Sequence, residues 1–231
     1  MKDRIVIVTG AFGALGRVVA QTLEDRGARV VRVDAAAALP TFLRNRPQVG
    51  LTLAGVDLTD LAATQAMVAE VVALTGAIDG LVNIAGGFRW ETLEAGDPAT
   101  WDLMHALNLK TALHACKACL PHLLNRPDGR IVNVGAAAAA KAGAGMGAYA
   151  ASKSAVLRLT EALAEETKER GLTVNAVLPG IIDTAANRAD MPGADASRWV
   201  APQALADVVA FLLSDAARAV TGAGIPVTGR L

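Results

Sequence analysis

Short apolar runs alternate with longer amphipathic stretches along the 231 residues of the chain. The runs are rich in β-branched residues and lack polar alternation, a pattern typical of parallel strands that are covered on both faces. About seven strands are predicted, at residues 5–8, 29–33, 51–57, 78–83, 129–134, 172–178 and 224–228. Helices are expected at about 14–26, 60–74, 100–124, 149–170 and 202–214, with a long loop at 181–200. This alternation predicts an α/β fold, a doubly wound parallel sheet flanked by helices.

The composition suits one domain that spans residues 1–231. Apolar residues make up 53% and charged residues 19% of the chain, a balance that suits a sheet covered on both sides. The 22 basic and 22 acidic residues cancel, so neither a nucleic-acid nor a membrane partner is expected. The chain runs from its first residues straight into a strand, which leaves no room for a signal peptide, and no apolar run is long enough to cross a membrane. We therefore expect a cytoplasmic protein that acts on a small molecule.

A glycine-rich turn, Thr9–Gly16, follows the first strand and leads into the first helix. Glycines at such a turn let the backbone approach a pyrophosphate, and the helix N-terminus offers it free N–H groups. The second strand ends in Asp34, whose carboxylate can accept hydrogen bonds from both adenosine ribose hydroxyls and would repel a 2′-phosphate. Together these features predict a single NAD-binding Rossmann domain with strand order 3-2-1-4-5-6-7 that prefers NAD(H) over NADP(H).

A tyrosine and a lysine four residues apart, Tyr149 and Lys153, lie at the start of a predicted helix. Residues at this spacing share one face of a helix, so the phenol and the ammonium can point into one cleft. The ammonium favours the phenolate and, together with a nearby positively charged cofactor, is expected to lower the pKa of Tyr149 towards 7, which suits acid–base chemistry at neutral pH. The alternative is a helix-surface pair without a role. The catalytic interpretation is favoured because the other motifs lie at strand ends, where such sheets bind ligands.

Several motifs together resemble the short-chain dehydrogenase/reductase family across essentially the whole chain. They are Thr9-Gly10 with Gly13 and Gly16, Asp57-Leu58, Asn83-x-Ala85-Gly86, Asn108, Tyr149-x-x-x-Lys153, and Pro179-Gly180 with Thr184. The resemblance implies Tyr149, Lys153 and Asn108 as catalytic residues, with Asn108 anchoring a proton-relay water near Lys153. A residue that only kinks its helix is the alternative for Asn108. The family likeness also implies a homodimer or homotetramer, formed through the helices at 100–124 and 149–170.

The same resemblance assigns residues to the cofactor. Asp57 would receive the adenine amino group, Lys153 would also hold the nicotinamide ribose, and the segment around Thr184 would contact the carboxamide. The full set expected at the cofactor is Gly10, Phe12, Gly13, Ala14, Leu15, Gly16, Asp34, Asp57, Leu58, Asn83, Ala85, Gly86, Lys153, Pro179, Gly180, Ile182 and Thr184.

Two positions depart from the family pattern. Ala14 stands where the classical first turn has glycine. Position 136, where a serine is normally found about thirteen residues before the tyrosine, is alanine, and residues 136–140 contain no hydroxyl. In a carbonyl reductase that serine holds the substrate oxygen, and loss of such a donor typically costs about 10²–10³ in rate. Either the substrate does not need the donor, or the protein is not a catalyst.

The quinonoid dihydropteridine reductase branch of the family also lacks the serine and also resembles this chain. The likeness includes Gly13–Gly16, Ala85-Gly86-Gly87 followed by an aromatic residue, and Gly145-Met146 before Tyr149. It is most specific in and just before the loop at 181–200, which is expected to be a substrate-side lid. There it covers Leu178-Pro179, Asp183-Thr184, Asn187-Arg188, Met191-Pro192, Ala194-Asp195 and Trp199. A quinonoid dihydropterin accepts hydride without a developing alkoxide, so the serine would be dispensable.

The branch likeness implies a set of substrate-side residues and leaves two choices open. Its tryptophan that stacks on the pterin is replaced by Phe88, so either Phe88 or Trp90 stacks, or both simply close the loop. Trp199 is either a wall of the substrate site or an anchor of its loop. The full set is Gly87, Phe88, Trp90, Ala136, Tyr149, Asn187 and Trp199.

The expected function is NADH-dependent hydride transfer to a quinonoid dihydropteridine or a similar electron-poor conjugated acceptor, with Tyr149 as proton donor. Two alternatives stay open: a short-chain reductase of another carbonyl or quinone, and a serine-less NAD-binding module with little catalysis. No metal is expected. Cys116 and Cys119 lie in the middle of a predicted helix with only His114 and His122 nearby, which favours core packing over a metal or redox site.

Overall fold

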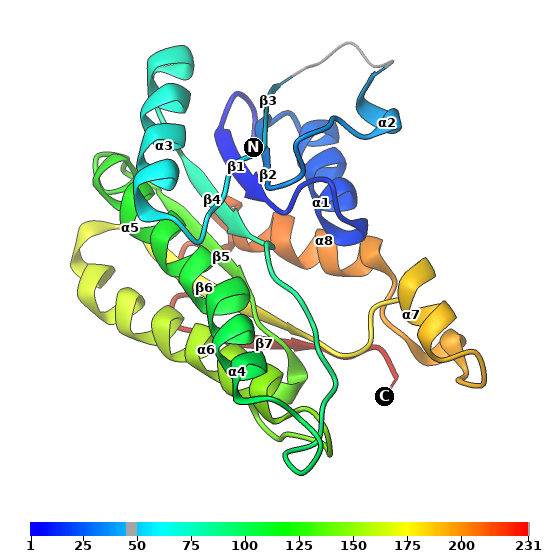
Figure 1. Cartoon of the computed structure of the whole chain (residues 1–231). Helices are drawn as coiled ribbons and strands as arrows, with labels where there is room; N and C mark the ends of the chain where they lie inside the picture. Colours follow the sequence, from blue (N-terminus) through cyan, green and yellow to red (C-terminus); the bar gives the residue numbers. More distant parts are fainter. Residues whose placement is uncertain (45–49, 231) are drawn as a thin grey trace.

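A parallel sheet of seven strands forms the centre of the protein, in a computed structural model that describes residues 1–44 and 50–230 (Figure 1). The strand order is β3-β2-β1-β4-β5-β6-β7, and all neighbouring strands are parallel. The predicted fold class and strand order are confirmed. Residues 45–49 and 231, which the predicted domain 1–231 includes, lie outside the described residues. The strands are β1 (Ile5–Thr9), β2 (Arg29–Asp34), β3 (Leu51–Ala54), β4 (Gly80–Asn83), β5 (Arg130–Val134), β6 (Thr173–Pro179) and β7 (Gly224–Val227).

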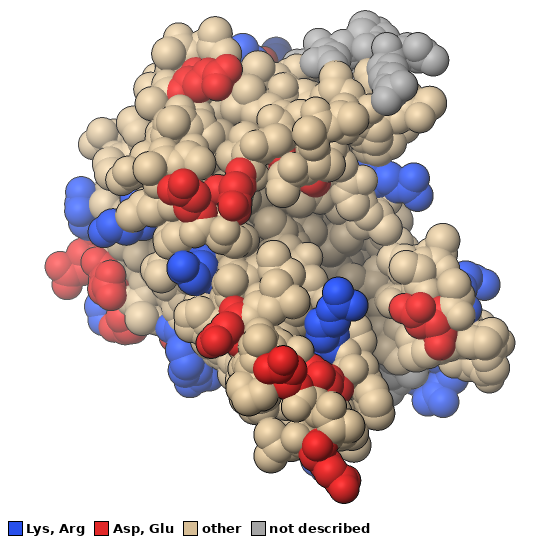
Figure 2. Space-filling model, in the orientation of Figure 1, with Lys and Arg blue, Asp and Glu red and all other residues tan. Residues whose placement is uncertain are grey.

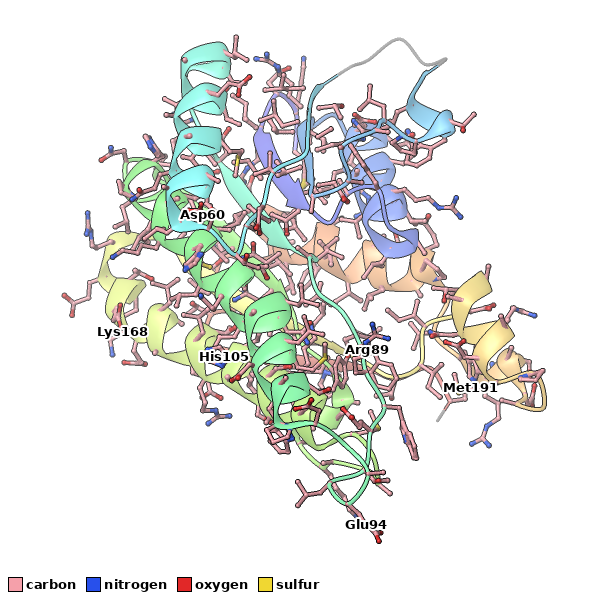
Figure 3. The ribbon with its side chains drawn as sticks, in the orientation of Figure 1. Asp60, Arg89, Glu94, His105, Lys168 and Met191 are labelled. Atoms are coloured by element: carbon pink, nitrogen blue, oxygen red, sulfur yellow. The ribbon has the colours of Figure 1, made fainter. Side chains whose placement is uncertain are left out.

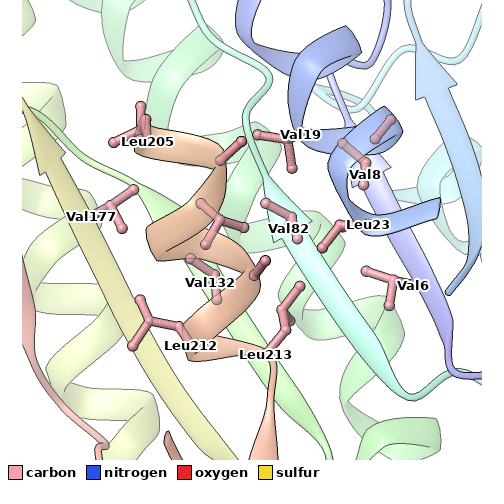
Figure 4. Close-up of a cluster of buried hydrophobic side chains, with 14 of the residues drawn as sticks. Val6, Val8, Val19, Leu23, Val82, Val132, Val177, Leu205, Leu212 and Leu213 are labelled. Carbon is pink, nitrogen blue, oxygen red and sulfur yellow. The ribbon is translucent and has the colours of Figure 1, made fainter. Parts of the chain in front are cut away.

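Alternate residues of a strand face opposite layers of helices. In β1, Val6 and Val8 pack in the cluster shown in Figure 4, whereas Ile5 and Ile7 pack in the cluster on the other face. Because both faces are buried, the strands have no polar side, which explains their continuous apolar runs. The first layer holds α1 (Ala14–Asp25) and α8 (Pro202–Leu212), and the second holds α3 (Leu61–Thr75), α5 (Thr111–Leu123) and α6 (Gly147–Thr167).

Several element boundaries differ from those predicted, each for a local reason. β3 ends at Ala54 rather than 57 because Gly55 turns the backbone into the left-handed region, with φ +72°. β4 begins at Gly80 rather than 78, and the preceding Asp79 uses its carboxylate to accept a hydrogen bond from the Ile5 N–H at 2.7 Å. A short helix that the apolar pattern did not predict, α2 (Thr41–Arg44), follows β2.

The helix predicted at 100–124 is a continuous helical segment in three parts. It starts with α4 (Pro98–Met104), passes through a π-helical stretch at His105–Lys110, and continues as α5. Apolar periodicity does not reveal such a stretch, since it adds only about one residue per turn. π-Helical turns are rare and are frequent at functional sites. This one carries the buried Asn108.

The segment predicted as a loop at 181–200 contains regular structure. It holds α7 (Ala185–Asp190) and a 3₁₀ turn at Ala196–Arg198. An isolated parallel bridge between Ile182 and Val200 closes its base. In Figure 1 this segment projects on the right beside the C-terminus, at the edge of the molecule towards which β6 runs.

Candidate active site

A cavity of about 530 Å³ opens at the carboxyl ends of β1, β2 and β4. Parallel α/β sheets bind their ligands at this edge. Figure 2 shows the face of the molecule with a hollow near its centre and charged side chains of both signs around it. The cavity is lined by many of the residues predicted at the cofactor: Gly10, Phe12, Gly13, Ala14, Leu15, Gly16, Asp34, Asp57, Leu58, Ala85 and Gly86.

The glycine-rich turn fits the pyrophosphate of a dinucleotide. Gly10 has φ +62°, and a Cβ there would lie 2.8 Å from the backbone nitrogen of Ala85. A Cβ on Gly16 would overlap the carbonyl oxygen of Gly10. Gly13 precedes α1 and no side chain caps that helix, so the N–H groups of its first turn are free for an anion. The turn therefore has the close backbone approach and the free N–H groups that a pyrophosphate would need.

A second cavity, of about 340 Å³, lies between α1 and α7 and shares Phe12 and Ala14 with the first. Thr184 lines it and caps α7, where its hydroxyl oxygen accepts a hydrogen bond from Asn187 N–H at 3.1 Å. The hydroxyl hydrogen is left to donate to a ligand. The other three residues predicted in this stretch, Pro179, Gly180 and Ile182, line neither cavity.

Asp34 ends β2 at the rim of the larger cavity. Its two oxygens accept hydrogen bonds from Phe12 N–H at 2.9 Å and Ala36 N–H at 3.0 Å. Each carboxylate oxygen has a further lone pair for a ribose hydroxyl. Arg32 is not available to a phosphate, because it is buried in a bidentate pair with Glu24 at 2.6 Å. The charge that faces this end of the cavity is therefore negative.

Asp57 lies along the same cavity, beyond the end of β3. One of its oxygens accepts hydrogen bonds from the hydroxyl of Thr59 at 2.7 Å and from its N–H at 2.8 Å. The hydroxyl bond is the main reason why the pKa of Asp57 lies below its ordinary value. The carboxylate is therefore ionised at neutral pH, and its second oxygen can accept a hydrogen bond from an amino group.

The first turns of α6 hold Tyr149 and Lys153. The Lys153 Nζ donates a hydrogen bond to the carbonyl of Val134 at 2.8 Å and lies 6.0 Å from the centre of the Tyr149 ring. Burial lowers the pKa of Lys153 to about 8 and raises the pKa of Tyr149 to about 12. The ammonium by itself does not lower the Tyr149 pKa, because desolvation of the phenol outweighs it at this distance. The expected fall towards 7, which also counts the charge of a bound cofactor, stays a prediction. At neutral pH the phenol is protonated.

Asn108 is fixed between three elements. Its amide nitrogen donates to the Gly87 carbonyl and to the Ser152 hydroxyl, both at 3.0 Å, and its oxygen accepts from Gly87 N–H at 2.9 Å. A Cβ on Gly86 would lie 2.5 Å from the Asn108 oxygen and 3.5 Å from the Lys153 Nζ. The structure thus brings Asn108 and Lys153 together. Ser152 was not singled out from the sequence, although its place three residues after Tyr149 puts it on the same helix face.

The segment that follows β5, residues 135–140, carries no hydroxyl side chain. Ala136 is buried there, directly after Gly135. The two serines of α6 do not replace the missing group, because both donate to backbone carbonyls at 2.7 Å: Ser152 to Tyr149 and Ser154 to Ala139. A substrate oxygen bound beside Ala136 would therefore find Tyr149 as its side-chain hydroxyl donor.

Phe88, rather than Trp90, lies against Tyr149. The rings of Phe88 and Tyr149 meet edge to face, with centroids 4.9 Å apart and planes at 82°. Trp90 packs instead on Gly145, where a Cβ would overlap its indole ring. The neighbouring Glu91 N–H donates to the Gly145 carbonyl at 2.8 Å, which ties the two loops together.

Asn83, Trp199 and Asn187 line neither cavity. Asn83 is 4% exposed and its amide donates to Asn133 at 2.8 Å, so its side chain lies in the core and not in the cofactor cleft. Trp199 is 7% exposed and lines neither cavity, which supports its role as a loop anchor. Asn187 donates its amide to the Ile182 carbonyl at 2.7 Å and holds α7 against its own base. Burial and local pairing remove these three side chains from the cleft.

Comparison with known proteins decides the family. Residues 4–194 match the family described as short chain dehydrogenase. The chain belongs to this family. It is 32% identical to 2-(S)-hydroxypropyl-CoM dehydrogenase 3 of Xanthobacter autotrophicus, over 99% of this chain and 96% of the relative. It is also 32% identical to the 3-oxoacyl-(acyl-carrier-protein) reductase of Escherichia coli, over 99% and 97%.

Solved structures of short-chain dehydrogenases agree with this fold along the whole chain. The aldohexose dehydrogenase of Thermoplasma acidophilum superimposes with a TM-score of 0.88 and 28% identity, covering 100% of this chain and 94% of that one. The carveol dehydrogenase of Mycobacterium avium, solved in complex with NAD, gives 0.86 and 26%, covering 99% and 97%. These matches establish the short-chain dehydrogenase family and no finer branch of it.

The cysteines of this short-chain dehydrogenase belong to the core. Cys116 and Cys119 are both on the buried face of α5, and burial raises the pKa of the Cys116 thiol to about 12. Within residues 1–44 and 50–230, no group of histidine, cysteine or acidic side chains has the arrangement of a metal site. None of the helices in these ranges is both long and apolar enough for a bilayer.

Proposed function

We propose that this short-chain dehydrogenase transfers hydride from NADH to a quinonoid dihydropterin or a similar electron-poor conjugated acceptor, with Tyr149 as the proton donor. The reaction consumes the acceptor, NADH and one proton, and yields the reduced acceptor and NAD⁺. Bound NADH supplies the hydride. Asp34 favours NADH because its carboxylate accepts ribose hydroxyls and repels a 2′-phosphate.

Tyr149 carries the proton in this account. Its pKa of about 12 keeps the phenol protonated at neutral pH, so it can give its proton to the acceptor atom that becomes basic as hydride arrives. Lys153 stabilises the phenolate that remains, since its pKa of about 8 leaves it mostly charged at pH 7. Asn108, held by Gly87 and Ser152, lies beside Lys153 and can hold a water that returns the proton.

The observation that carries the proposal is the alanine at position 136. A ketone becomes an alkoxide as hydride is added, and a second hydroxyl donor then contributes about 10²–10³ in rate. A conjugated acceptor spreads the new charge over its ring system, so a single proton donor suffices. The site keeps Tyr149, Lys153 and Asn108 together while the hydroxyl donor is missing.

A carbonyl reductase is the second candidate. The relatives favour it, since their names denote oxo and hydroxy compounds as substrates. Such an enzyme would rely on Tyr149 alone to hold the substrate oxygen.

The test is NADH oxidation by the purified protein with chemically generated quinonoid dihydropterin, beside a panel of quinones and simple ketones. We expect the dihydropterin and the quinones to be reduced fastest, and NADH to be used in preference to NADPH. Turnover of ketones alone would overturn the acceptor class and favour the carbonyl reductase. If no acceptor of the panel is reduced and the protein still binds NADH, the result would favour an NAD-binding module without catalysis.

We further propose that the chain forms a homodimer or homotetramer through α5 and α6, and that residues 181–200 act as a substrate-side lid. Trp101, Leu103 and Leu113 on α4 and α5 are 40–45% exposed, an apolar surface that self-association would cover. Light scattering of the purified protein distinguishes the assemblies, and a monomer at micromolar concentration would contradict them.

A further inference from the structure

We propose that Arg89 recognises an anionic group on the acceptor, so that the substrate is an electron-poor acceptor carrying a carboxylate, sulfonate or phosphate. This inference rests on the proposed function and narrows its substrate class. Arg89 is exposed on the loop that follows β4, between the two aromatic residues Phe88 and Trp90. Figure 3 shows its side chain extending from this loop towards the segment that carries α7.

The direction of Arg89 follows from its neighbours. Phe88 meets the Tyr149 ring at 4.9 Å, and Trp90 packs on Gly145, just before α6. Arg89, which stands between them, extends away from these two contacts and towards the segment that carries α7 (Figure 3).

Arg89 has no carboxylate partner within residues 1–44 and 50–230. Arg188, on α7, differs because it has one. The guanidinium of Arg188 is paired with Asp183 at 2.5 and 2.8 Å. Glu91, the nearest acid in sequence to Arg89, accepts a hydrogen bond from Asp97 N–H within its own loop at 2.8 Å. The guanidinium of Arg89 therefore keeps its fork of donors for a ligand.

This position suits recognition of the acceptor rather than of the cofactor. Most of the residues expected at the cofactor line the 530 Å³ cavity, whereas Arg89 lines neither this cavity nor the one beside α7. Phe88, which precedes Arg89 in the sequence, contacts the Tyr149 ring, so an acceptor bound at Tyr149 would lie next to the loop that carries Arg89. A guanidinium binds planar anions through two parallel hydrogen bonds, which fixes orientation as well as charge. An anionic group at this place would turn the reducible ring towards Tyr149.

The experiment compares phenanthrenequinone with its sulfonate, two acceptors that differ by one anionic group. In the wild-type protein with NADH, kcat/KM should be higher for the sulfonated quinone, and salt should reduce the difference. In Arg89→Ala the ratio of the two kcat/KM values should fall about tenfold, through KM for the sulfonate, because a charge-assisted hydrogen bond is lost. Arg89→Lys should keep part of the ratio, since it keeps the charge and loses the fork.

Arg158→Ala is the matched control. It removes the same charge from an exposed site on α6, where the side chain pairs with Glu161, and it should leave the ratio unchanged. An unchanged ratio in Arg89→Ala would overturn the proposal. So would an equal loss of NADH affinity in that variant, because the contact would then be with the cofactor.

Binding separates failure of this inference from failure of the proposed function. Calorimetry with the enzyme–NAD⁺ complex should show tighter binding of the sulfonated quinone, and loss of that preference in Arg89→Ala. If the preference appears without any turnover, the anion contact stands and the reductase proposal fails. If turnover appears without the preference, the reductase stands and the anion contact fails.

Discussion

The two halves of the cleft are built in different ways. On the cofactor side, the backbone makes the site: Gly10 and Gly16 have no room for a side chain, and the first turn of α1 presents uncapped N–H groups. On the substrate side, side chains from distant segments make it, with Phe88 against Tyr149 and Trp90 against Gly145. The first half is fixed by local sequence and the second by long-range packing.

This difference explains why the family could be recognised and the substrate could not. A dinucleotide is the same molecule in every relative, so the same backbone turn serves it. The acceptor varies, and it meets exposed loop side chains such as Phe88 and Trp90, which are 53% and 63% exposed. The proposals about the acceptor rest on that half, where Ala136 and Arg89 are the informative residues.

The largest expected effect is that of Tyr149→Phe, which should impair the substrate half of the cleft and leave the cofactor half intact. Tyr149→Phe removes the proton donor and keeps the ring against Phe88, so turnover should fall by about 10²–10⁴. NADH affinity, measured by fluorescence titration, should stay within about twofold, because the hydroxyl is not part of the glycine turn. An undiminished rate would remove Tyr149 from the mechanism.

Lys153 lies where the cofactor and substrate halves of the cleft meet, and its burial should lower the free energy of unfolding at neutral pH. Burial lowers the Lys153 pKa from 10.5 to about 8, so the unfolded chain binds this proton more tightly and charging Lys153 destabilises the fold below pH 8. Lys153→Met should abolish turnover and raise the free energy of unfolding at pH 7 by about 1–3 kcal/mol, allowing for the lost bond to Val134.

The pH dependence gives the sign of this effect. The gain in free energy of unfolding of Lys153→Met over wild type should be full below pH 8. It should vanish as the pH rises to about 10.5, where the folded and the unfolded chain have both lost the Lys153 proton. Urea unfolding at several pH values measures it. Lys168→Met, at an exposed pair with Glu165, is the control and should show no such trend. A less stable Lys153→Met protein at pH 7 would contradict the argument.

Cofactor choice should depend on the charge of Asp34. Asp34→Asn keeps the size of the side chain and removes the charge that repels a 2′-phosphate, so the NADH/NADPH ratio of kcat/KM should fall about tenfold. Asp25→Asn removes an exposed charge at the far end of α1 and should leave the ratio as it is. Equal ratios in Asp34→Asn and wild type would refute the assignment.

The sequence predicted the sheet because its signals are local. Each strand is an apolar run, and features such as the Asp60 cap of α3, which accepts hydrogen bonds from Ala62 and Ala63 N–H, are encoded within a few residues. The glycine turn and Asp34 were found for the same reason. The strand order followed from the Rossmann arrangement that the dinucleotide-binding features indicate, since alternation alone is compatible with more than one order.

The remainder depends on contacts between distant residues. No local pattern indicates the π-helical stretch that aims Asn108 at Gly87 and Ser152, or the burial that raises the Tyr149 pKa. Asn83 ends a strand, as a ligand residue would, yet its amide pairs with Asn133 in the core. Side-chain direction at a strand end is set by the neighbouring strand, which local sequence does not show.

The most direct test of the central claim is the effect of Ala136→Ser on two acceptors, quinonoid dihydropterin and a simple ketone, with NADH. Because the conjugated acceptor needs no second hydroxyl donor, its kcat/KM should change by less than about twofold, while that of the ketone should rise about tenfold or more. Ala140→Ser, at the exposed end of the same turn, should change neither. A large gain in kcat/KM for the dihydropterin would contradict the account, because it would show that this acceptor does need a second hydroxyl donor.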